Sequence, residues 1–214
     1  MCTRPKQRGI SLIELIMFIV IVSVALAGIL LVMNVTTRGS VDPLIHKQSL
    51  AIAESLLEEV ELMPFTYCDP NDPTAATATS ATVGAGACTV QVENIGPEAA
   101  FAPYQPTTET RYSTSTPFDN VNDYNGCQMN TGTINGCDST GTGGIRDINN
   151  SLIGPAAGYS ASVAVAAQAF SGIAALDANS TAQVLLITVT VTGPDGLPVV
   201  LQGIRTRYDP TAMP

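Results

Sequence analysis

Hydrophobic and polar residues alternate in different ways along the chain, and the first stretch is purely apolar. No charged side chain occurs between Glu14 and Arg38. At about 1.5 Å per residue, a helix over this stretch is roughly 35 Å long and crosses a hydrocarbon core of about 30 Å. The basic residues Arg4, Lys6 and Arg8 precede it. The positive-inside rule therefore places the N-terminus in the cytoplasm and the chain after Arg38 outside.

The second stretch has the period of an amphipathic helix that ends at Pro64. Asp42 and Pro43 resemble an N-cap and a first-turn proline, so we expect a break or kink there. His46, the single histidine, has a predicted surface or packing role. Because apolar residues recur at helical spacing, we expect this face to pack under a sheet. The apolar positions are Ile45, Ile52, Ala53, Leu56, Leu57, Val60 and Met63.

The C-terminal third alternates with the period of strands. Apolar and polar residues alternate over 159–165 and in the later part of 184–191, and 193–196 is a turn signal followed by a strand over 199–208. Pro198 falls at the strand start, where a missing donor matters least. Three antiparallel strands against the amphipathic helix predict an α+β fold.

Between helix and strands, residues 65–158 are dominated by Gly, Pro, Ser, Thr, Asn and Asp. Residues 89–93 are the one strand candidate, and 75–87 are predicted to form a flexible surface loop. A weakly patterned stretch of this length often carries recognition or mobility. We therefore expect a loop-rich variable region.

Four cysteines lie beyond the apolar stretch, and Cys2 lies before it. An even number outside the cytoplasm predicts two disulfides, with three possible connectivities. We favour the sequential pairing of Cys68 with Cys88 and of Cys127 with Cys137, since both bonds would close loops. A zinc site is the alternative, but the chain lacks a C-x-x-C pair and has a single histidine.

Residues 118–126 are rich in oxygen donors. Asp119, Asn122, Asp123 and Asn125 precede Gly126. The spacing does not fit the twelve-residue calcium loop with its closing glutamate. Turn formation is the preferred interpretation, and calcium binding is the alternative.

Charge and chemistry exclude several functions. The formal net charge is -9, and without Arg4, Lys6 and Arg8 the 9 basic residues fall to 6 against 18 acidic ones. Such acidity argues against nucleic-acid binding and is best explained by solubility. The sequence has no histidine near a candidate nucleophile, no phosphate-binding glycine loop and no cofactor motif. We therefore expect a non-enzyme without a cofactor.

Residues 9–15, Gly-Ile-Ser-Leu-Ile-Glu-Leu, resemble the processing and assembly signal of type IV pilins and type II secretion pseudopilins. The resemblance implies that prepilin peptidase cuts between Gly9 and Ile10 and methylates Ile10. It also implies that Glu14, the fifth residue of the mature chain, pairs with the N-terminal amine of a neighbouring subunit. The family usually has phenylalanine at the position of Ile10.

Physical chemistry supports this pairing independently of the family. A carboxylate at the front of a membrane segment costs on the order of 2–3 kcal/mol or more without a partner, so Glu14 is a functional candidate. Cleavage would create an amine four residues before it, and the pairing would set the axial register of neighbouring helices. An ordinary signal peptide cut near Ala25-Leu26-Ala27 and a plain single-pass anchor are the alternatives.

The expected organisation is a leader (1–9), a transmembrane assembly helix (10–37), its amphipathic continuation (38–64), the loop-rich region with disulfides (65–158) and an antiparallel sheet (159–214). Residues 118–126, 51–63 and the final hairpin are similar to minor pilins of the MSHA type. This resemblance implies a Gram-negative minor pilin that enters or primes an adhesive pilus filament.

The partners implied are other pilin subunits, prepilin peptidase and the inner-membrane assembly platform. The precursor would span the inner membrane once with its head in the periplasm, and the mature protein would reach the pilus and cell surface. The alternatives are a minor pseudopilin of type II secretion and a single-pass anchored periplasmic binding module that captures a ligand with 65–158.

Overall fold

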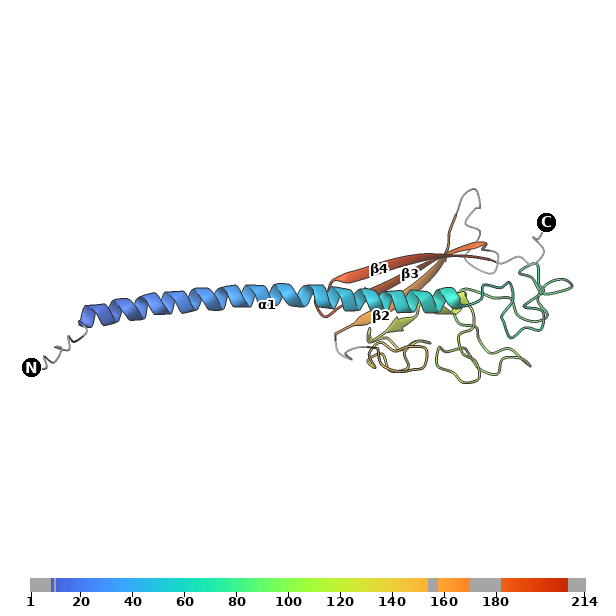
Figure 1. Ribbon diagram of the computed structural model, residues 1–214. Coiled ribbons are helices and arrows are strands. Elements are labelled where there is room, and N and C mark those ends of the chain that lie inside the picture. The colour runs from blue at the N-terminus through green and yellow to red at the C-terminus, as the bar shows by residue number, and fades with distance from the viewer. Residues whose placement is uncertain (1–8, 10, 154–157, 170–181, 208–214) are drawn as a thin grey trace, which may run out of the picture. The chain divides into compact units, whose positions relative to one another are not determined.

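The computed structural model describes residues 9, 11–153, 158–169 and 182–207, without the side chains of 35–42. Its elements, labelled in Figure 1 where there is room, follow the order helix, loops, sheet. The chain divides into two units, Met1–Leu44 and Ile45–Pro214, and each is described by itself. The predicted α+β class is confirmed. The elements are α1 (Leu12–Leu62), η1 (Val121–Tyr124), β1 (Gln128–Met129), β2 (Ser160–Ala167), β3 (Val184–Thr192) and β4 (Pro198–Thr206).

The helix α1 continues through Pro43, so the predicted break is wrong, while the predicted kink at this position stays a prediction. A proline inside a helix removes one backbone hydrogen bond and its ring crowds the carbonyl four residues earlier, at a cost of about 3 kcal/mol. The bonds on both sides of that position remain available to continue the helix. The predicted end is correct, because the helix stops at Leu62 just before Pro64.

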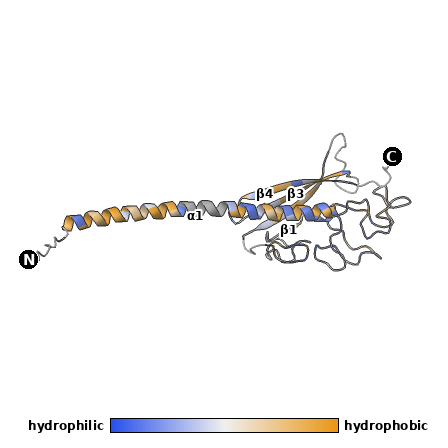
Figure 2. Ribbon diagram, viewed as in Figure 1, coloured by the Kyte–Doolittle hydropathy of each residue, from blue (hydrophilic) through white to orange (hydrophobic). Residues whose placement is uncertain are grey.

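The head begins with the amphipathic part of α1. Ile52, Ala53, Leu56 and Val60 are buried, and they form one core with residues of the sheet. Ile45, Leu57 and Met63 pack against that core from its edge. The predicted apolar face is therefore the face that packs on the sheet. Figures 1 and 2 show this part of α1 lying along the strands.

Two glycines let the sheet approach the helix closely. A Cβ at Gly203 of β4 would collide with Glu61 and meet the Leu57 side chain, and a Cβ at Gly193 would lie 2.7 Å from Ile45 Cγ2. A larger residue at either position would force these helix side chains to move, so the two glycines allow the close approach.

The sheet is antiparallel with the order β1-β2-β3-β4. Val189 pairs with Val163 on β2 and with Leu201 on β4, so β3 lies in the middle. Its side chains alternate, with Leu185 and Ile187 among the fully buried ones. The strands predicted from alternation are confirmed, whereas the two-residue strand β1 was not anticipated. We call β2–β4 and the α1 segment from Ile45 to Leu62 the helix–sheet layer.

Residues 65–153, the loop region, contain little regular structure beyond η1 and β1. The strand predicted over 89–93 is wrong, since only Val92 forms an isolated bridge, with Cys68. The carboxylate of Asp72 instead accepts the backbone N–H groups of Thr89, Val90 and Gln91 at 3.1, 2.7 and 3.0 Å. A side chain thus satisfies donors that a partner strand would otherwise take.

Candidate functional site

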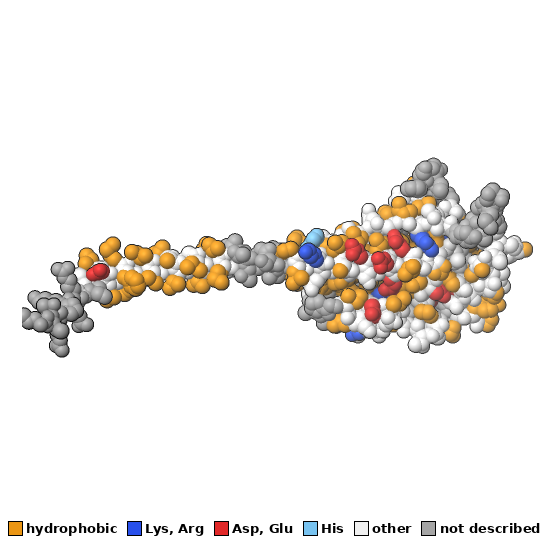
Figure 3. All heavy atoms as spheres, in the orientation of Figure 1, with side chains coloured by type: hydrophobic (Ala, Val, Ile, Leu, Met, Phe, Trp, Pro, Cys, Tyr) orange, Lys and Arg blue, Asp and Glu red, His pale blue; other side chains and the backbone are white. Residues whose placement is uncertain are grey.

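The first part of α1 exposes apolar side chains all round. Leu12–Asn34 has a mean hydropathy of 3.2 and is long and apolar enough to cross a membrane. None of its side chains is buried within the chain. Figure 3 shows hydrophobic side chains along this segment with one acidic side chain near its start. A helix that is apolar on every face needs lipid or other helices around it.

Glu14 is the acidic residue in the first turn of α1. Its side chain is exposed, and its backbone N–H donates to the Ser11 carbonyl at 3.0 Å. A carboxylate in the first helical turn is favoured by the helix dipole, which is a structural reason for its presence. The dipole does not offset the cost of placing that charge among apolar side chains. The position therefore still calls for a positively charged partner.

The predicted processing site lies at the edge of the described chain. Gly9 is described and exposed, while Ile10 and residues 1–8 lie outside the described residues. Cleavage between Gly9 and Ile10 and methylation of Ile10 therefore stay predictions. The alternative signal-peptide site, Ala25-Leu26-Ala27, lies within the helix α1.

Two disulfides close loops in the head. Cys68 is bonded to Cys88 and Cys127 to Cys137, which is the sequential pairing. All four cysteines are buried. The first bond belongs to a small satellite core with Ala78, while Cys127 and Cys137 belong to the main core.

The oxygen-rich segment 118–126 forms η1 with a capping box. Asn120 accepts from the N–H of Asn122, and Asp123 Oδ2 accepts the N–H groups of Asp119 and Asn120 at 2.9 and 2.7 Å. The predicted turn-forming role is thus visible in the hydrogen bonds. Asn125 is directed elsewhere, because its Oδ1 accepts the N–H of Val165 on β2. The four calcium candidates therefore do not form one site.

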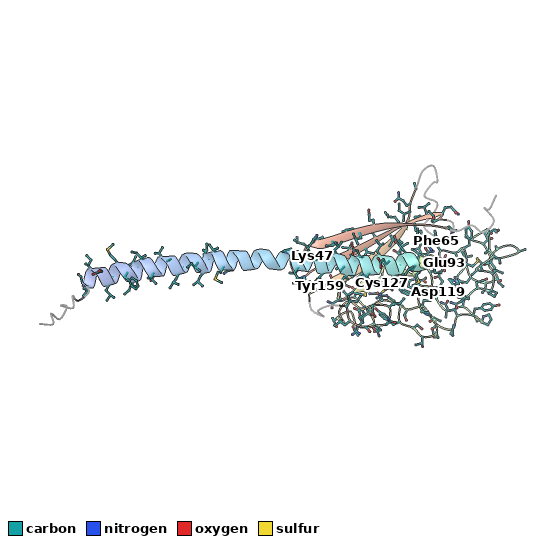
Figure 4. All side chains as sticks on the ribbon, viewed as in Figure 1. Lys47, Phe65, Glu93, Asp119, Cys127 and Tyr159 are labelled. Atoms are coloured by element: carbon teal, nitrogen blue, oxygen red, sulfur yellow. A yellow bond between two sulfur atoms is a disulfide. The ribbon has the colours of Figure 1, made fainter. Side chains whose placement is uncertain are left out.

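Two of those candidates join carboxylates from distant parts of the loop region. The side chains form three groups in which one oxygen from each member lies within 4.8 Å of the others. Every pair of groups shares one residue, so all three form a single cluster. Figure 4 shows Glu93 and Asp119 near the C-terminal end of α1. The groups are Asp69–Glu98–Glu109, Glu93–Glu98–Asp123 and Glu109–Asp119–Asp123, and we call these six residues the carboxylate cluster.

The cluster is buried and its carboxylates are held in a repeated manner. Five members receive a hydrogen bond on one oxygen, while the second oxygen receives none from a described donor. In Glu93, which is 1% exposed, neither oxygen receives one. The held oxygens are those of Asp69 (from Asn71 N, 2.6 Å), Glu98 (Asn94 N, 2.7 Å), Glu109 (Glu98 N, 3.0 Å), Asp119 (Asn71 Nδ2, 2.9 Å) and Asp123.

Burial and mutual repulsion disfavour ionisation of these groups in the ion-free chain. Burial is the largest cause throughout, and the charge of a neighbouring carboxylate adds to it. The pKa values of Asp69 and Glu93 are raised. Raised pKa values are also found at Glu98 (about 8), Glu109 (about 9), Asp119 (about 7) and Asp123 (about 8).

Sequence reasoning missed Asp69, Glu93, Glu98 and Glu109 as members of one site. They lie in separate loops without a common period, and only the fold brings them together. No local pattern links them: Glu93 follows the apolar Val92, whereas Glu109 lies between Thr108 and Thr110.

A cavity of about 500 Å³ also lies in the loop region. Its lining includes Tyr112, Asn135, Asp138 and Arg146. The lining contains no histidine, and its one cysteine, Cys137, is in a disulfide. These lining residues therefore lack a nucleophile activated by a base.

Comparison with known proteins places only the N-terminal segment. The family model described as "Prokaryotic N-terminal methylation motif" matches residues 4–30. No curated protein and no solved structure matches the chain. The match supports the type IV pilin or pseudopilin class, which is structural rather than catalytic. It implies processing by prepilin peptidase and assembly with other pilins, and the apolar helix fits a single-pass anchor.

Proposed function

We propose that the protein is a minor type IV pilin of the MSHA type. The observation that carries this proposal is Glu14 in the first turn of an otherwise apolar helix, five residues after Gly9, within the matched methylation motif. The α+β order of the head supports the same class. A non-catalytic, filament-forming role follows from these features.

Processing would create the group that Glu14 needs. Cleavage between Gly9 and Ile10 leaves an amine at Ile10, and four residues of helix span about 6 Å along the axis. Two neighbouring helices offset by about this distance place the amine of one beside the carboxylate of the other. The apolar faces draw helices together without fixing their axial position, and the ion pair fixes it. Repeating the contact head to tail yields an open filament.

A minor rather than a major subunit is favoured by the head. The loop region is held by two disulfides and a buried carboxylate cluster, and it is an unusual addition to a simple sheet. The resemblance of 118–126, 51–63 and the final hairpin to minor pilins of the MSHA type supports the finer assignment. We place the precursor in the inner membrane of a Gram-negative cell, and the assembly platform delivers it to an adhesive pilus.

Two other functions share part of this support. A minor pseudopilin of type II secretion would carry the same signal, and its filament partners would distinguish it. An anchored periplasmic binding module would use the cavity beside Tyr112 and Arg146. That module would not require an amine at Ile10.

The mature N-terminus tests processing. Mass spectrometry of the protein from cells with and without prepilin peptidase should show N-methylated Ile10 only when the peptidase is present. A chain that starts at Met1 in both strains would support the simple anchor. A chain that starts at Gly28 would support the signal peptide.

The variant Glu14→Ala tests assembly. We expect normal cleavage and membrane insertion, but at least a tenfold loss from sheared pili, because the neighbour's amine loses its partner. Ser23→Ala is the matched control, since the Ser23 hydroxyl already donates to the Ile19 carbonyl at 2.7 Å within its own helix. Equal recovery of Glu14→Ala and Ser23→Ala in pili would contradict the proposal.

A further inference from the structure

We propose that the carboxylate cluster of Asp69, Glu93, Glu98, Glu109, Asp119 and Asp123 binds calcium ions and thereby fastens the loop region together. The inference rests on the geometry of the head alone. It stands or falls independently of the proposed pilin function.

The first argument is charge. Six carboxylates share one buried region, and Arg207 acts electrostatically on Glu93. Arg207 also donates to the carbonyls of Thr66 and Ala182. Arg111, another buried cation of the head, is paired with Glu59 outside the cluster. One guanidinium cannot compensate six ionised carboxylates, and buried charge without compensation is strongly destabilising, so the ion-free chain keeps protons on the cluster and a bound cation would replace them. Divalent cations supply the missing charge.

The second argument is the direction of the unpartnered oxygens. Calcium binds oxygen at 2.3–2.6 Å, so two oxygens on opposite sides of one ion lie up to about 5.2 Å apart. The oxygens within each group of the cluster meet this limit. Glu93 is buried with neither oxygen hydrogen-bonded by a described donor. Its carboxylate reaches Glu98 and Asp123 instead.

The third argument is how the side chains are fixed. In five carboxylates one oxygen is held by a backbone or amide N–H, which leaves the other to face its neighbours. Donors behind the ligands orient metal-binding groups and are typical of built metal sites. The oxygens left to face one another lie close enough for one cation to contact several of them at once. Asn122, beside Asp123, adds a buried Oδ1 that receives no described hydrogen bond.

The donor set selects calcium over other metals. All six groups supply hard oxygen, and the described cysteines of the head are all bonded in disulfides, which argues against zinc. Magnesium keeps several waters and demands a regular octahedron, whereas calcium accepts six to eight protein oxygens in irregular geometry. A buried cage of carboxylates from scattered loops suits calcium.

The test uses the full-length chain purified in detergent, with CaCl2 alone as the probe. Isothermal titration calorimetry should show saturable binding with one or two ions per chain. Calcium should raise the midpoint of thermal unfolding by more than about 5 °C relative to protein in EGTA. MgCl2 should bind at least tenfold more weakly. Absence of calcium binding at millimolar concentration, or equal binding of magnesium, would overturn the proposal.

Two variants locate the site. Glu93→Gln and Asp123→Asn should each weaken calcium binding at least tenfold, while the exposed Glu54→Gln should leave it unchanged. In EGTA, Glu93→Gln should be at least as stable as the unmodified chain, because a neutral amide replaces a buried carboxyl group whose ionisation is disfavoured. Calcium affinity that survives both substitutions would place the ion elsewhere and overturn the proposal. Should a variant fail to fold in EGTA, the titrations of the unmodified chain with the two metals still decide.

Discussion

The helix–sheet layer and the loop region, the two parts of the head, are each stabilised by a different kind of interaction. The helix–sheet layer buries apolar side chains such as Leu56, Leu185 and Ile187, and its backbone is satisfied by regular pairing. The loop region relies on disulfides and on carboxylates that accept backbone N–H groups, as Asp72 and Asp138 do. Polar contacts therefore replace periodic structure where the sequence has no period.

The junction between these halves is also polar. Glu59 of α1 accepts Arg111 Nε at 2.7 Å and Arg111 Nη2 at 2.5 Å, and the Tyr124 hydroxyl at 2.8 Å. Burial opposes the charged form of Arg111, but the hydrogen bonds and charge of Glu59 outweigh it and raise the pKa of Arg111. One side chain of the layer thus positions two of the loop region.

The largest expected effect is a pH dependence confined to the loop region in calcium-depleted buffer. The pKa values of Glu98, Glu109 and Asp123 are about 8, 9 and 8 in the folded chain, against ordinary values of 4.5 for Glu and 3.8 for Asp. The folded state therefore holds protons that the unfolded state releases. The stability from these groups is present below pH about 4 and is lost as the pH rises towards 9. Each pKa unit is worth roughly 1.4 kcal/mol per group.

Hydrogen exchange at pH 5, 7 and 9, corrected for the intrinsic rate, measures this difference. Loop-region amides should lose protection as the pH rises, whereas Leu185 and Ile187 of β3 should keep theirs. The other groups facing this site are Asp69, Glu93, Asp119 and Arg207, so single substitutions should only reduce the slope. Uniform loss across both halves would show that they unfold as one unit.

The next largest effect comes from Glu59→Ala. The change leaves the Arg111 guanidinium buried without its carboxylate, which costs about 3–5 kcal/mol of unfolding free energy. Denaturant unfolding measures the loss. The neighbouring Glu58→Ala is the matched control, because Glu58 is exposed on the same helix and should change stability by less than about 0.5 kcal/mol. A similar loss of unfolding free energy in both variants would show that the ion pair between Glu59 and Arg111 does not stabilise the junction.

The smallest effect is expected from replacing Cys68 and Cys88 together with serine. Opening a disulfide that closes a loop of this length lowers the free energy of unfolding by about 3 kcal/mol, because the unfolded chain gains conformational entropy. The bond lies in a satellite core, so amides around Ala78 and Val92 should lose protection while β3 does not. Replacing Cys127 and Cys137 should reach further, since Cys127 accepts the Val163 N–H of β2 at 2.8 Å. Hydrogen exchange measures the loss of amide protection in both double variants. A loss that covers the same residues in both would contradict the distinction between the satellite core and the main core.

The parts of the fold that could be predicted from the sequence are those in which apolar positions recur at a regular spacing. The apolar stripe through Ile52, Leu56 and Val60 and the alternation of β3 specify helix and sheet because each repeats over many residues. The break expected at Pro43 was wrong, since one missing hydrogen bond does not end a long helix. The strand expected over 89–93 was wrong because Asp72 takes its donors.

The same distinction applies to the candidate sites: residues at a fixed local spacing could be predicted, and residues from separate loops could not. Gly9, Ile10 and Glu14 could be named because their spacing is local, although their roles remain predictions. Only two members of the carboxylate cluster, in 118–126, could be singled out. The other four come from separate loops whose convergence depends on tertiary contacts, and no local pattern encodes those contacts.

The two cross-links do not interleave along the chain: one spans 20 residues, the next spans 10, and the first is closed before the second begins. In the topology that we propose, the head is exported N-terminal end first, so each ring can close once its own short segment has emerged, without waiting for distant partners. A crossed pairing would require the first thiol to stay reduced until much more of the polypeptide had appeared. Under the proposed export into an oxidising compartment, the order in which the cysteines emerge therefore favours the native bonds.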